Sequence, residues 1–417
     1  MPDVEAWPTE SRAAGEIVEG RQVHLGAFDR ARLKHEIAYF DFIQHSGVLE
    51  ELDAALVAPR FVRTEFPGAD ECLMYAERSD LRLCRQASSA RAAALRLTAE
   101  SADWPEFVRA WTHLVRLAMA YSHDAVVISH LVSQSALVRA MDELCLLLTE
   151  HRLDASVCGP LLDSLATGEV LAPFDSSLEG ERLVMYDLIQ RCYSDDSRGD
   201  GLLMIDALEK FAENDHWSRR FGSIEHPVFQ LVGVVYPRRA ETKHALDEFM
   251  DAAVRQSHMT RLDSVGDSVS LERLRDELRE RHVFLRFCLP VLEGALDRHH
   301  AFRAKIAATR ILLGIELYEA LHGEPPQSLD DLVPEWLPQA PIDAVSGRSF
   351  VYVRREPTPD DPRRFLLYSV GVDGEDNGGV ETDEARPDAA LSSRVKPELR
   401  DGFDYIFNRL REPAEEQ

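Results

Sequence analysis

The hydrophobic pattern changes its period near Leu321, and this change constrains the fold more than any other feature of the chain. From about Phe28 to Leu321, apolar residues recur at spacings of three and four, the period of one face of an α-helix. Beyond this point the sequence is rich in proline and glycine and contains two alternating segments, residues 349–353 and 365–370. The pattern predicts a mainly α-helical array followed by a small α+β unit with an antiparallel sheet.

The chain has 417 residues, of which 45% are hydrophobic, and this is more than one ordinary core requires. No repeat of fixed period is present, so an irregular helical array is expected rather than a solenoid. We expect a flexible N-terminus at 1–20, one or two helical domains at 21–300, an α+β domain at 301–391, and an amphipathic C-terminal helix with its tail at 392–417.

Within the helical part, turn-rich sequences separate the expected helices. Asp103 and Pro105 are typical of a helix start, which predicts a helical hairpin over about 84–120. The clearest helix is expected from His123 to Glu150, with one apolar stripe formed by Val127, Leu131, Val138, Met141, Cys145 and Leu148. Further helices are expected at about 28–55, 180–193, 202–212, 243–256 and 271–296.

Acidic residues outnumber basic residues, 73 to 47, and the formal net charge is -26. Such a chain repels nucleic acid and anionic membrane surfaces, so neither is expected as a partner. The N-terminal sequence lacks a signal, and charged residues interrupt the apolar runs before they reach the length of a membrane span. The chain as given is expected to be soluble, without a transmembrane segment.

The six cysteines are scattered, without a CxxC pair or a zinc-finger spacing. Buried thiols are compatible with this spacing, and so are disulfides in an oxidising compartment. The sequence alone leaves the compartment open.

Three segments near the C-terminus carry a family resemblance. They are ATRILLGIELYEALHGEPPQSLDDLVPEWLP at 308–338, DAVSGRSFVYV at 343–353 and FLLYSVGVDGEDNGG at 365–379. In order and spacing they resemble the globular domain of the type II secretion major pseudopilin. The resemblance implies a helix, a proline-rich connection, a turn, a short strand and a calcium-binding loop. Ala344 stands where the family's turn has proline, and the family's long apolar N-terminal helix is missing.

The helical part has its own resemblance. ISHLVSQSALVRAMDELCLLL and GERLVMYDLIQ resemble large envelope-associated proteins of planctomycete-type bacteria that end in the same pseudopilin-like unit. That family has no assigned activity, so the resemblance implies architecture and a location at the cell envelope. It also suggests a membrane anchor upstream of Met1.

The loop DGEDNGGVETDE, residues 373–384, combines carboxylates with glycines, which suits calcium, a cation that takes six to eight oxygen ligands. The resemblance assigns Asp373 as a calcium ligand and places Glu381 and Asp383 near the family's later acidic ligands. The order of residues also matches an EF-hand loop ending at Glu384, although a strand rather than a helix is expected before it. The alternative to a calcium site is a solvated acidic loop whose glycines only form turns. Our candidate calcium ligands are Asp373, Asp376, Glu381, Asp383 and Glu384.

Histidines offer a second candidate site. His123 and His130 are seven residues apart in a predicted helix and would share a face, with Asp124 and Glu143 as nearby oxygen ligands. The alternative is that His130 is a structural residue beside the core stripe. No HExxH, GxSxG, P-loop or strand-following GxGxxG motif is present, so no catalytic residue and no organic cofactor is predicted.

At the C-terminus, apolar residues again recur at helical spacing, which predicts an amphipathic helix that docks on its own domain or on a partner. These residues are Leu399, Phe403, Ile406, Phe407 and Leu410. We interpret the whole chain as a non-catalytic interaction or scaffold protein with a calcium-stabilised, pseudopilin-like C-terminal domain, linked to the bacterial cell envelope or a secretion-like system. Its protein partner is not identified by the sequence. The alternatives are a cryptic metal-dependent hydrolase with a site between helices, and a cytoplasmic helical adaptor.

Overall fold

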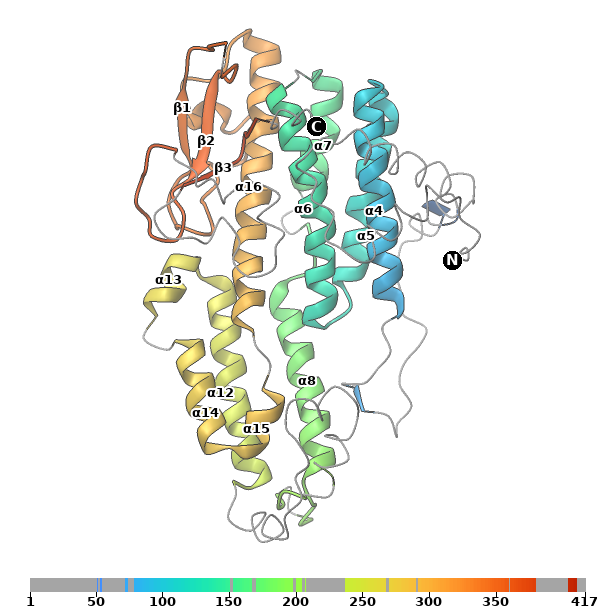
Figure 1. The fold of residues 1–417 in the computed structure, drawn as a ribbon, viewed down its shortest axis with the longest axis vertical. Coiled ribbons are helices and arrows are strands. Elements are labelled where there is room, and N and C mark those ends of the chain that lie inside the picture. The colour runs from blue at the N-terminus through green and yellow to red at the C-terminus, as the bar shows by residue number, and fades with distance from the viewer. Residues whose placement is uncertain are drawn as a thin grey trace, which may run out of the picture.

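The computed structural model confirms a helix-rich architecture with a small antiparallel sheet at its C-terminal end (Figure 1). It describes residues 51, 53–54, 72–73, 79–150, 153–166, 170–197, 200–204, 207, 237–267, 270–289, 292–359, 361–379 and 404–410. The predicted flexible segment 1–20 and nearly all of the predicted helix 28–55 lie outside these residues. The elements are α4 (Ser79–Glu100), α5 (Trp104–Ser122), α6 (Val127–Glu150), α7 (Ala155–Ala166), α8 (Phe174–Cys192), α12 (Arg239–His258), α13 (Arg261–Gly266), α14 (Leu271–Arg281), α15 (Val283–Cys288), α16 (Glu293–His322), η3 (Leu329–Leu332), β1 (Val351–Arg354), β2 (Phe365–Ser369) and β3 (Tyr405–Ile406).

The predicted hairpin consists of α4 and α5, which lie side by side. Asp103 is the N-cap of α5, and its carboxylate accepts a hydrogen bond from the backbone N–H of Glu106 at 3.3 Å. Pro105 occupies the first turn, where a backbone N–H has no acceptor within the helix, so the absence of this group costs no hydrogen bond. The local sequence signal therefore placed this helix start correctly.

The long helix α6 begins at Val127 rather than at His123. Residues 123–126 form a turn in which the carboxylate of Asp124 accepts a hydrogen bond from the Ser129 hydroxyl at 2.5 Å. A short acidic side chain that bonds locally in this way favours a turn over helix continuation. The predicted stripe is confirmed in part: Val127, Met141, Cys145 and Leu148 are buried, whereas Leu131 and Val138 are partly buried.

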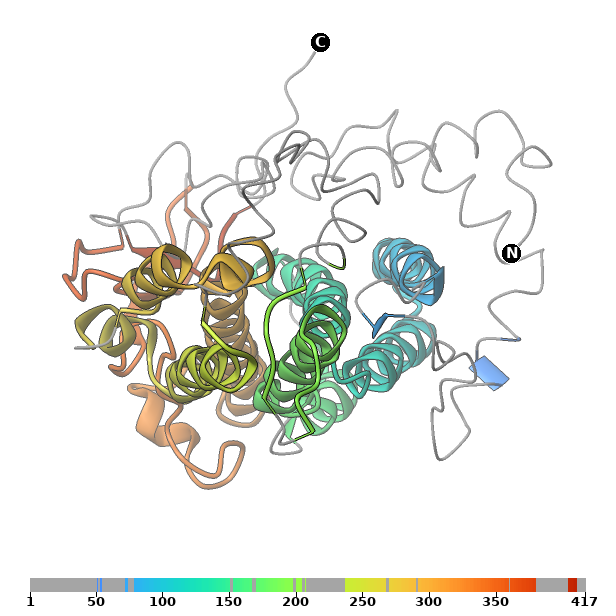
Figure 2. The same ribbon diagram turned by 90° about the horizontal axis from the view of Figure 1, so that it is seen from below.

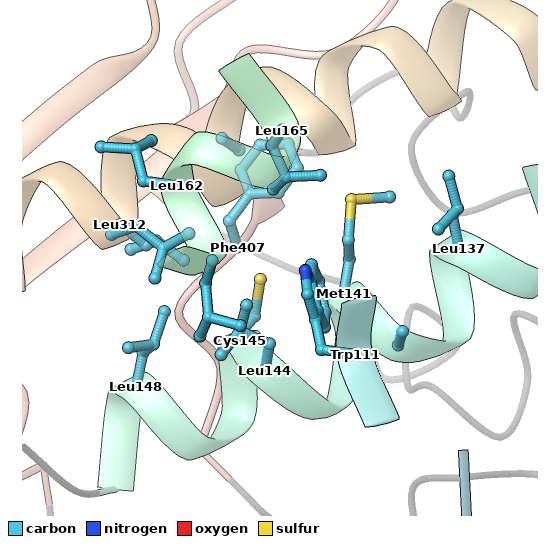
Figure 3. Packing of buried hydrophobic residues seen from close by; sticks show 14 of the residues in the cluster. Trp111, Leu137, Met141, Leu144, Cys145, Leu148, Leu162, Leu165, Leu312 and Phe407 are labelled. Atoms are coloured by element: carbon cyan, nitrogen blue, oxygen red, sulfur yellow. The ribbon is translucent and has the colours of Figure 1, made fainter. Parts of the chain in front are cut away.

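One hydrophobic core joins the helices α4–α7 to the C-terminal sheet. It takes side chains from these helices, from α16 from residue 302 onward, and from the sheet region, where Phe350, Leu367 and Phe407 contribute. Figure 3 shows Phe407 among leucines of α6, α7 and α16. The expected boundary between residues 300 and 301 falls inside α16, and the core continues along this helix into the sheet.

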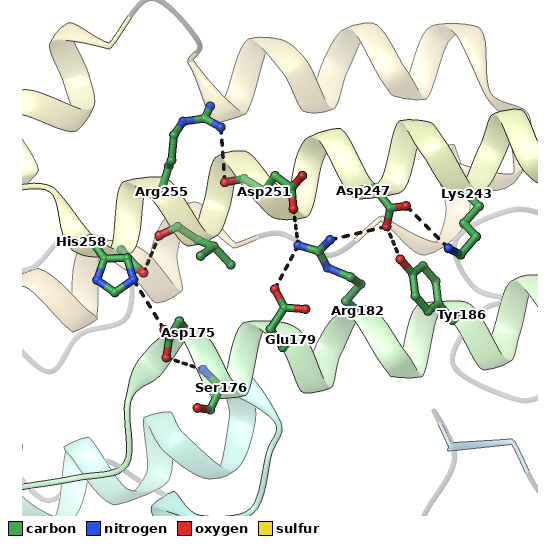
Figure 4. Close-up of polar contacts among 12 residues, drawn as sticks. Asp175, Ser176, Glu179, Arg182, Tyr186, Lys243, Asp247, Asp251, Arg255 and His258 are labelled. Carbon is green, nitrogen blue, oxygen red and sulfur yellow. Dashed lines mark hydrogen bonds and ion pairs between the residues drawn. The ribbon is translucent and has the colours of Figure 1, made fainter.

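A second hydrophobic core lies between α8, α12, α14, α15 and the first turns of α16. On the contact between α8 and α12, the guanidinium of Arg182 reaches Glu179, Asp247 and Asp251, the last at 2.6 Å (Figure 4). Viewed along the helices, α4 and α5 lie at one side and α12–α14 at the other, with α6 and α16 between them (Figure 2). The helix α16 thus contributes to both cores.

The single helix predicted at 271–296 is wrong, because the chain forms α14, α15 and the start of α16 there. The first break is at His282, whose backbone is extended at φ -117° and ψ 101°. The second is at Leu289, with ψ 120°, immediately before Pro290. A residue that precedes proline is sterically disfavoured in the helical region, which explains this second break.

The sheet has the order β1-β2-β3, and both pairs are antiparallel. Val351 is opposite Tyr368 and Arg354 is opposite Phe365, so the antiparallel pairing predicted from the two alternating segments is confirmed. The helix α16 precedes the sheet and ends at His322. Gly323, the next residue, adopts φ 81°, and its backbone N–H donates a hydrogen bond to the carbonyl of Glu319. This left-handed position ends the helix and suits glycine.

The predicted C-terminal helix is wrong over the described residues 404–410, where the chain forms β3 and a bend. Tyr405 and Phe407 enter the core shared with the helices, while Ile406 packs on the other side with Leu366 and Tyr368. Successive side chains that point to opposite sides are typical of a β-strand. A short apolar run fits both periods, and the cross-strand partner on β2 decides between them. Leu399 and Phe403 lie outside the described residues.

The helix predicted at 202–212 is described only at its start, where Leu203 forms an isolated bridge with Tyr193. Most of the remainder lies outside the described residues. Among the helices that the structure describes, none combines the length and apolar composition needed to cross a bilayer.

Candidate functional site

A buried carboxylate, that of Asp343, fixes the start of the acidic loop that follows β2. Asp343 is fully buried and accepts hydrogen bonds from the backbone N–H of Val345 at 2.9 Å and of Ser346 at 3.1 Å. The hydroxyls of Ser346 and Ser369 donate to the same carboxylate, each at 2.6 Å. Ser369 in turn accepts a bond from the N–H of Gly371 at 3.0 Å. Asp343 therefore fixes the turn, the end of β2 and the start of the loop together.

Within the loop, Asp373 and Asp376 each organise the backbone that follows. A carboxylate oxygen of Asp373 accepts the N–H of Glu375 at 3.0 Å, and one of Asp376 accepts the N–H of Gly378 at 2.9 Å. Asp376 also accepts the phenol hydroxyl of Tyr368 at 2.8 Å. Asp373 is partly buried and Asp376 is exposed, so both carboxylates lie at the rim of the loop.

Asp404 is a contact residue of this loop that sequence reasoning missed. It is 2% exposed, and its carboxylate accepts the N–H of Gly379 at 2.7 Å. Burial, the bond to Asp376 and the negative field of Asp404 together raise the pKa of Tyr368 far above its usual value. The loop thus lies against the segment that forms β3, twenty-five positions further along the chain. No local sequence signal links these two segments, because the contact depends on strand pairing.

The remaining candidate ligands, Glu381, Asp383 and Glu384, lie outside the described residues. Over the part of the chain that is described, no group of three histidine, cysteine, aspartate or glutamate side chains has an arrangement that would hold a metal ion. The loop is preceded by the strand β2, as expected, and not by the helix of an EF-hand. Of the five candidate ligands, the structure describes Asp373 and Asp376, and both lie in the loop after β2.

The structure does not bring the histidine candidates together. His123 is exposed in the turn before α6, while His130 is buried inside that helix at 1% exposure. Glu143 is engaged elsewhere, in a buried ion pair with the guanidinium of Arg96. Asp124 accepts the Ser129 hydroxyl. The seven-residue spacing was uninformative because the helix starts only after His123.

The six cysteines are all described, and each is buried as a thiol rather than joined in a disulfide. Burial raises the pKa of the Cys158 and Cys192 thiols to about 12. A thiol with such a pKa is almost entirely protonated near neutral pH and is a poor nucleophile. These two cysteines therefore act as apolar side chains in the cores.

Comparison with protein-family models, with curated proteins and with solved structures gives no match.

Proposed function

We propose that this protein is a non-catalytic interaction or scaffold component whose C-terminal α+β unit carries a calcium-stabilised loop. The observation that carries the proposal is the preformed loop at 371–379. Asp343 fixes its start through Ser369, Arg348 donates to the carbonyl of Gly374, and Asp404 holds the N–H of Gly379. A loop held at both ends presents its carboxylates at low entropic cost, which favours cation binding.

Calcium suits this loop better than a transition metal does. The side-chain donors at its rim are carboxylates, which are hard oxygen ligands, and neither histidine nor cysteine occurs between residues 371 and 384. Asp373 and Asp376 supply two such ligands, and Glu381, Asp383 and Glu384 follow closely in sequence. The net charge of -26 further favours cations over anionic partners.

The pseudopilin-like assignment is part of the same proposal. It is supported by the order of elements along the chain: the long helix α16, the connection that contains η3, the strand β1, the strand β2 and then the glycine-containing loop. This is the order that the resemblance implies. Within the proposal, the unit is linked to the cell envelope or a secretion-like system, and the helical part serves as the surface for a protein partner.

Two alternatives are distinguished by separate measurements. A metal-dependent hydrolase would hold a transition metal that is lost on His123→Ala, but the separation of His123 from His130 and the pairing of Glu143 with Arg96 argue against this site. A cytoplasmic helical adaptor would remain in the cytoplasmic fraction when cells are fractionated. The scaffold proposal predicts recovery with the envelope fraction.

Thermal unfolding of the purified protein in calcium, in magnesium and in chelator tests the calcium-binding loop. Calcium at about a hundred times its dissociation constant should stabilise the wild type by about 2.7 kcal/mol, because it binds the folded state. Asp373→Ala should abolish that gain. Asp330→Ala is the matched control, since Asp330 is an exposed acid of the same unit in η3. A midpoint that does not respond to calcium, or a response that Asp373→Ala retains, would contradict the proposal.

A further inference from the structure

Three histidines meet where the two hydrophobic cores join. His130 lies in the first turns of α6, and His299 and His300 lie in the first turns of α16, beside the start of α8 (Figure 1). His130 is 1% exposed and His300 is 0% exposed, while His299 is half-buried. Phe174, a residue of the second core, contacts two of these rings. On α16, the first core starts at Phe302, two residues after His300.

Aromatic packing holds two of the three rings, those of His130 and His299, in place. The ring of His299 stacks on Phe174, with centroids 4.4 Å apart and planes 13° from parallel. The ring of His130 packs edge-on against the same phenylalanine at 5.0 Å, and the centroids of His130 and His299 are 6.3 Å apart. Phe174, the first residue of α8, is therefore in contact with rings from both α6 and α16.

The ring nitrogens have few polar partners. Gln134 Nε2 lies 3.2 Å from His299 Nδ1, and in this orientation of the amide the nitrogen donates to Nδ1 of a neutral ring. Neither nitrogen of His300, nor Nδ1 of His130, has a hydrogen-bond partner among the described residues. A protonated ring in either position would be a buried charge without a counterion.

The surrounding charges do not compensate for such a proton. The carboxylate of Asp175 on α8 is paired with His258 on α12 at 3.6 Å (Figure 4). Asp297 on α16 is paired with Arg261 on α13 at 2.5 Å. Arg303 on α16 donates to the carbonyl of Met259 at 3.2 Å, so a further positive charge lies close by. On α6, the Gln134 amide contacts the ring of His299.

We propose that His130, His299 and His300 form an acid-sensitive junction: with neutral rings the ends of α6, α8 and α16 pack together, and proton uptake destabilises the packing that joins the two cores. This device is independent of the calcium loop. It needs no ligand and responds to pH alone.

The direction of the effect follows from burial. Burial lowers the pKa of His130 to about 4, and burial with the charges of Arg303 and Arg261 lowers that of His300 to about 3. Burial, followed by the charges of His300 and Arg303, also lowers the pKa of His299. Because these values lie below the 6.5 of an unfolded chain, stability is fully present above about pH 6.5 and is lost as the pH falls toward 4.

Denaturant unfolding at about pH 7.5 and about pH 5 tests the junction, with a double variant, His130→Leu/His300→Leu. The two rings should raise the wild-type unfolding constant on the order of a thousandfold between these conditions, because each binds a proton only when unfolded. The double variant should lack that contribution. His244→Gln, whose side chain is 77% exposed, should behave like the wild type.

A double variant with the full wild-type pH dependence would overturn the proposal. Should that variant not fold, the wild type still gives a decisive result by NMR of its histidine rings, assigned with the single variants. Two ring signals should keep their neutral positions in the folded protein from about pH 7.5 to about pH 5. Titration of all ring signals near 6.5 would overturn the proposal.

Discussion

Asp343 and His300 are both completely buried, yet their surroundings are opposite. The Asp343 carboxylate in the C-terminal unit accepts hydrogen bonds from two backbone N–H groups and two hydroxyls. The His300 ring, at the junction of the two cores, has no hydrogen-bond partner among the described residues. A buried charge is tolerated where a turn supplies donors, whereas an unpartnered ring is tolerated only while it is neutral.

The largest expected effect comes from removing the charge of Asp343. In Asp343→Asn, the amide group would face donors that need an acceptor, so the free energy of unfolding should fall by about 3 kcal/mol. Urea denaturation measures this loss. Asp330→Asn, at an exposed acid of the same unit, should change stability by less than about 0.5 kcal/mol. If both variants were equally mild, Asp343 would not be the support of the loop.

Gly379 lies at the opposite end of the loop from the residues that Asp343 supports. It adopts φ 75°, and a Cβ there would collide with Leu366 Cδ2, so Gly379→Ala should cost about 2 kcal/mol. Gly378 has the same φ of 75° but open space around it, so Gly378→Ala should cost about 1 kcal/mol from backbone strain alone. Thermal unfolding in chelator separates them. Equal losses would mean that the contact with β2 does not define the loop.

Lys305 is an intermediate case, a buried charge with a partner. Its ammonium lies 2.7 Å from Asp142 and above the rings of Tyr405 and Phe407, so it connects α16, α6 and β3. Lys305→Met should cost about 1.5 kcal/mol in urea denaturation, because the stem is kept and the charge is lost. Lys243, half exposed beside Asp247 and Tyr186, offers a matched control with an expected cost near 0.5 kcal/mol.

The smallest expected effect is at the exposed rim of the loop. Asp376→Asn weakens the acceptor for the Tyr368 hydroxyl and should cost about 0.5 kcal/mol without calcium. The bond to the carboxylate helps raise the pKa of Tyr368, so the variant should ionise this phenol at lower pH. Ultraviolet absorbance titration of tyrosinate measures the change. An unaltered titration would place the Asp376 carboxylate away from the phenol in solution.

The sequence predicted the elements whose signals are local. Asp103 with Pro105 marked the start of α5, and the two alternating runs marked β1 and β2, because capping and side-chain alternation depend on neighbouring residues. The end of a helix at Leu289 was not predicted, although the following Pro290 is a signal for it. The helical spacing of apolar residues continues across this position and favoured a single helix. For elements with such local signals, the type was therefore more predictable than the boundary.

The parts of the site that depend on distant pairing could not be read from the sequence. Tyr405 and Ile406 form a strand because β2 offers an open edge, and that pairing brings Asp404 to Gly379. The four donors to Asp343 come from its own turn and from the end of β2, so its role also requires the sheet register. The alternative that His130 is a structural residue beside the core stripe agrees with its burial, whereas the exposure of His123 depends on where α6 begins.

Hydrogen–deuterium exchange with calcium and with chelator tests the calcium-stabilised loop most directly. Calcium should slow exchange at residues 371–384 and at 404–407, because the loop lies against the segment of Asp404, and α5 should be unchanged. Asp373→Ala should exchange alike in both conditions. Identical exchange of the wild-type loop with calcium and with chelator would contradict a calcium site in this unit.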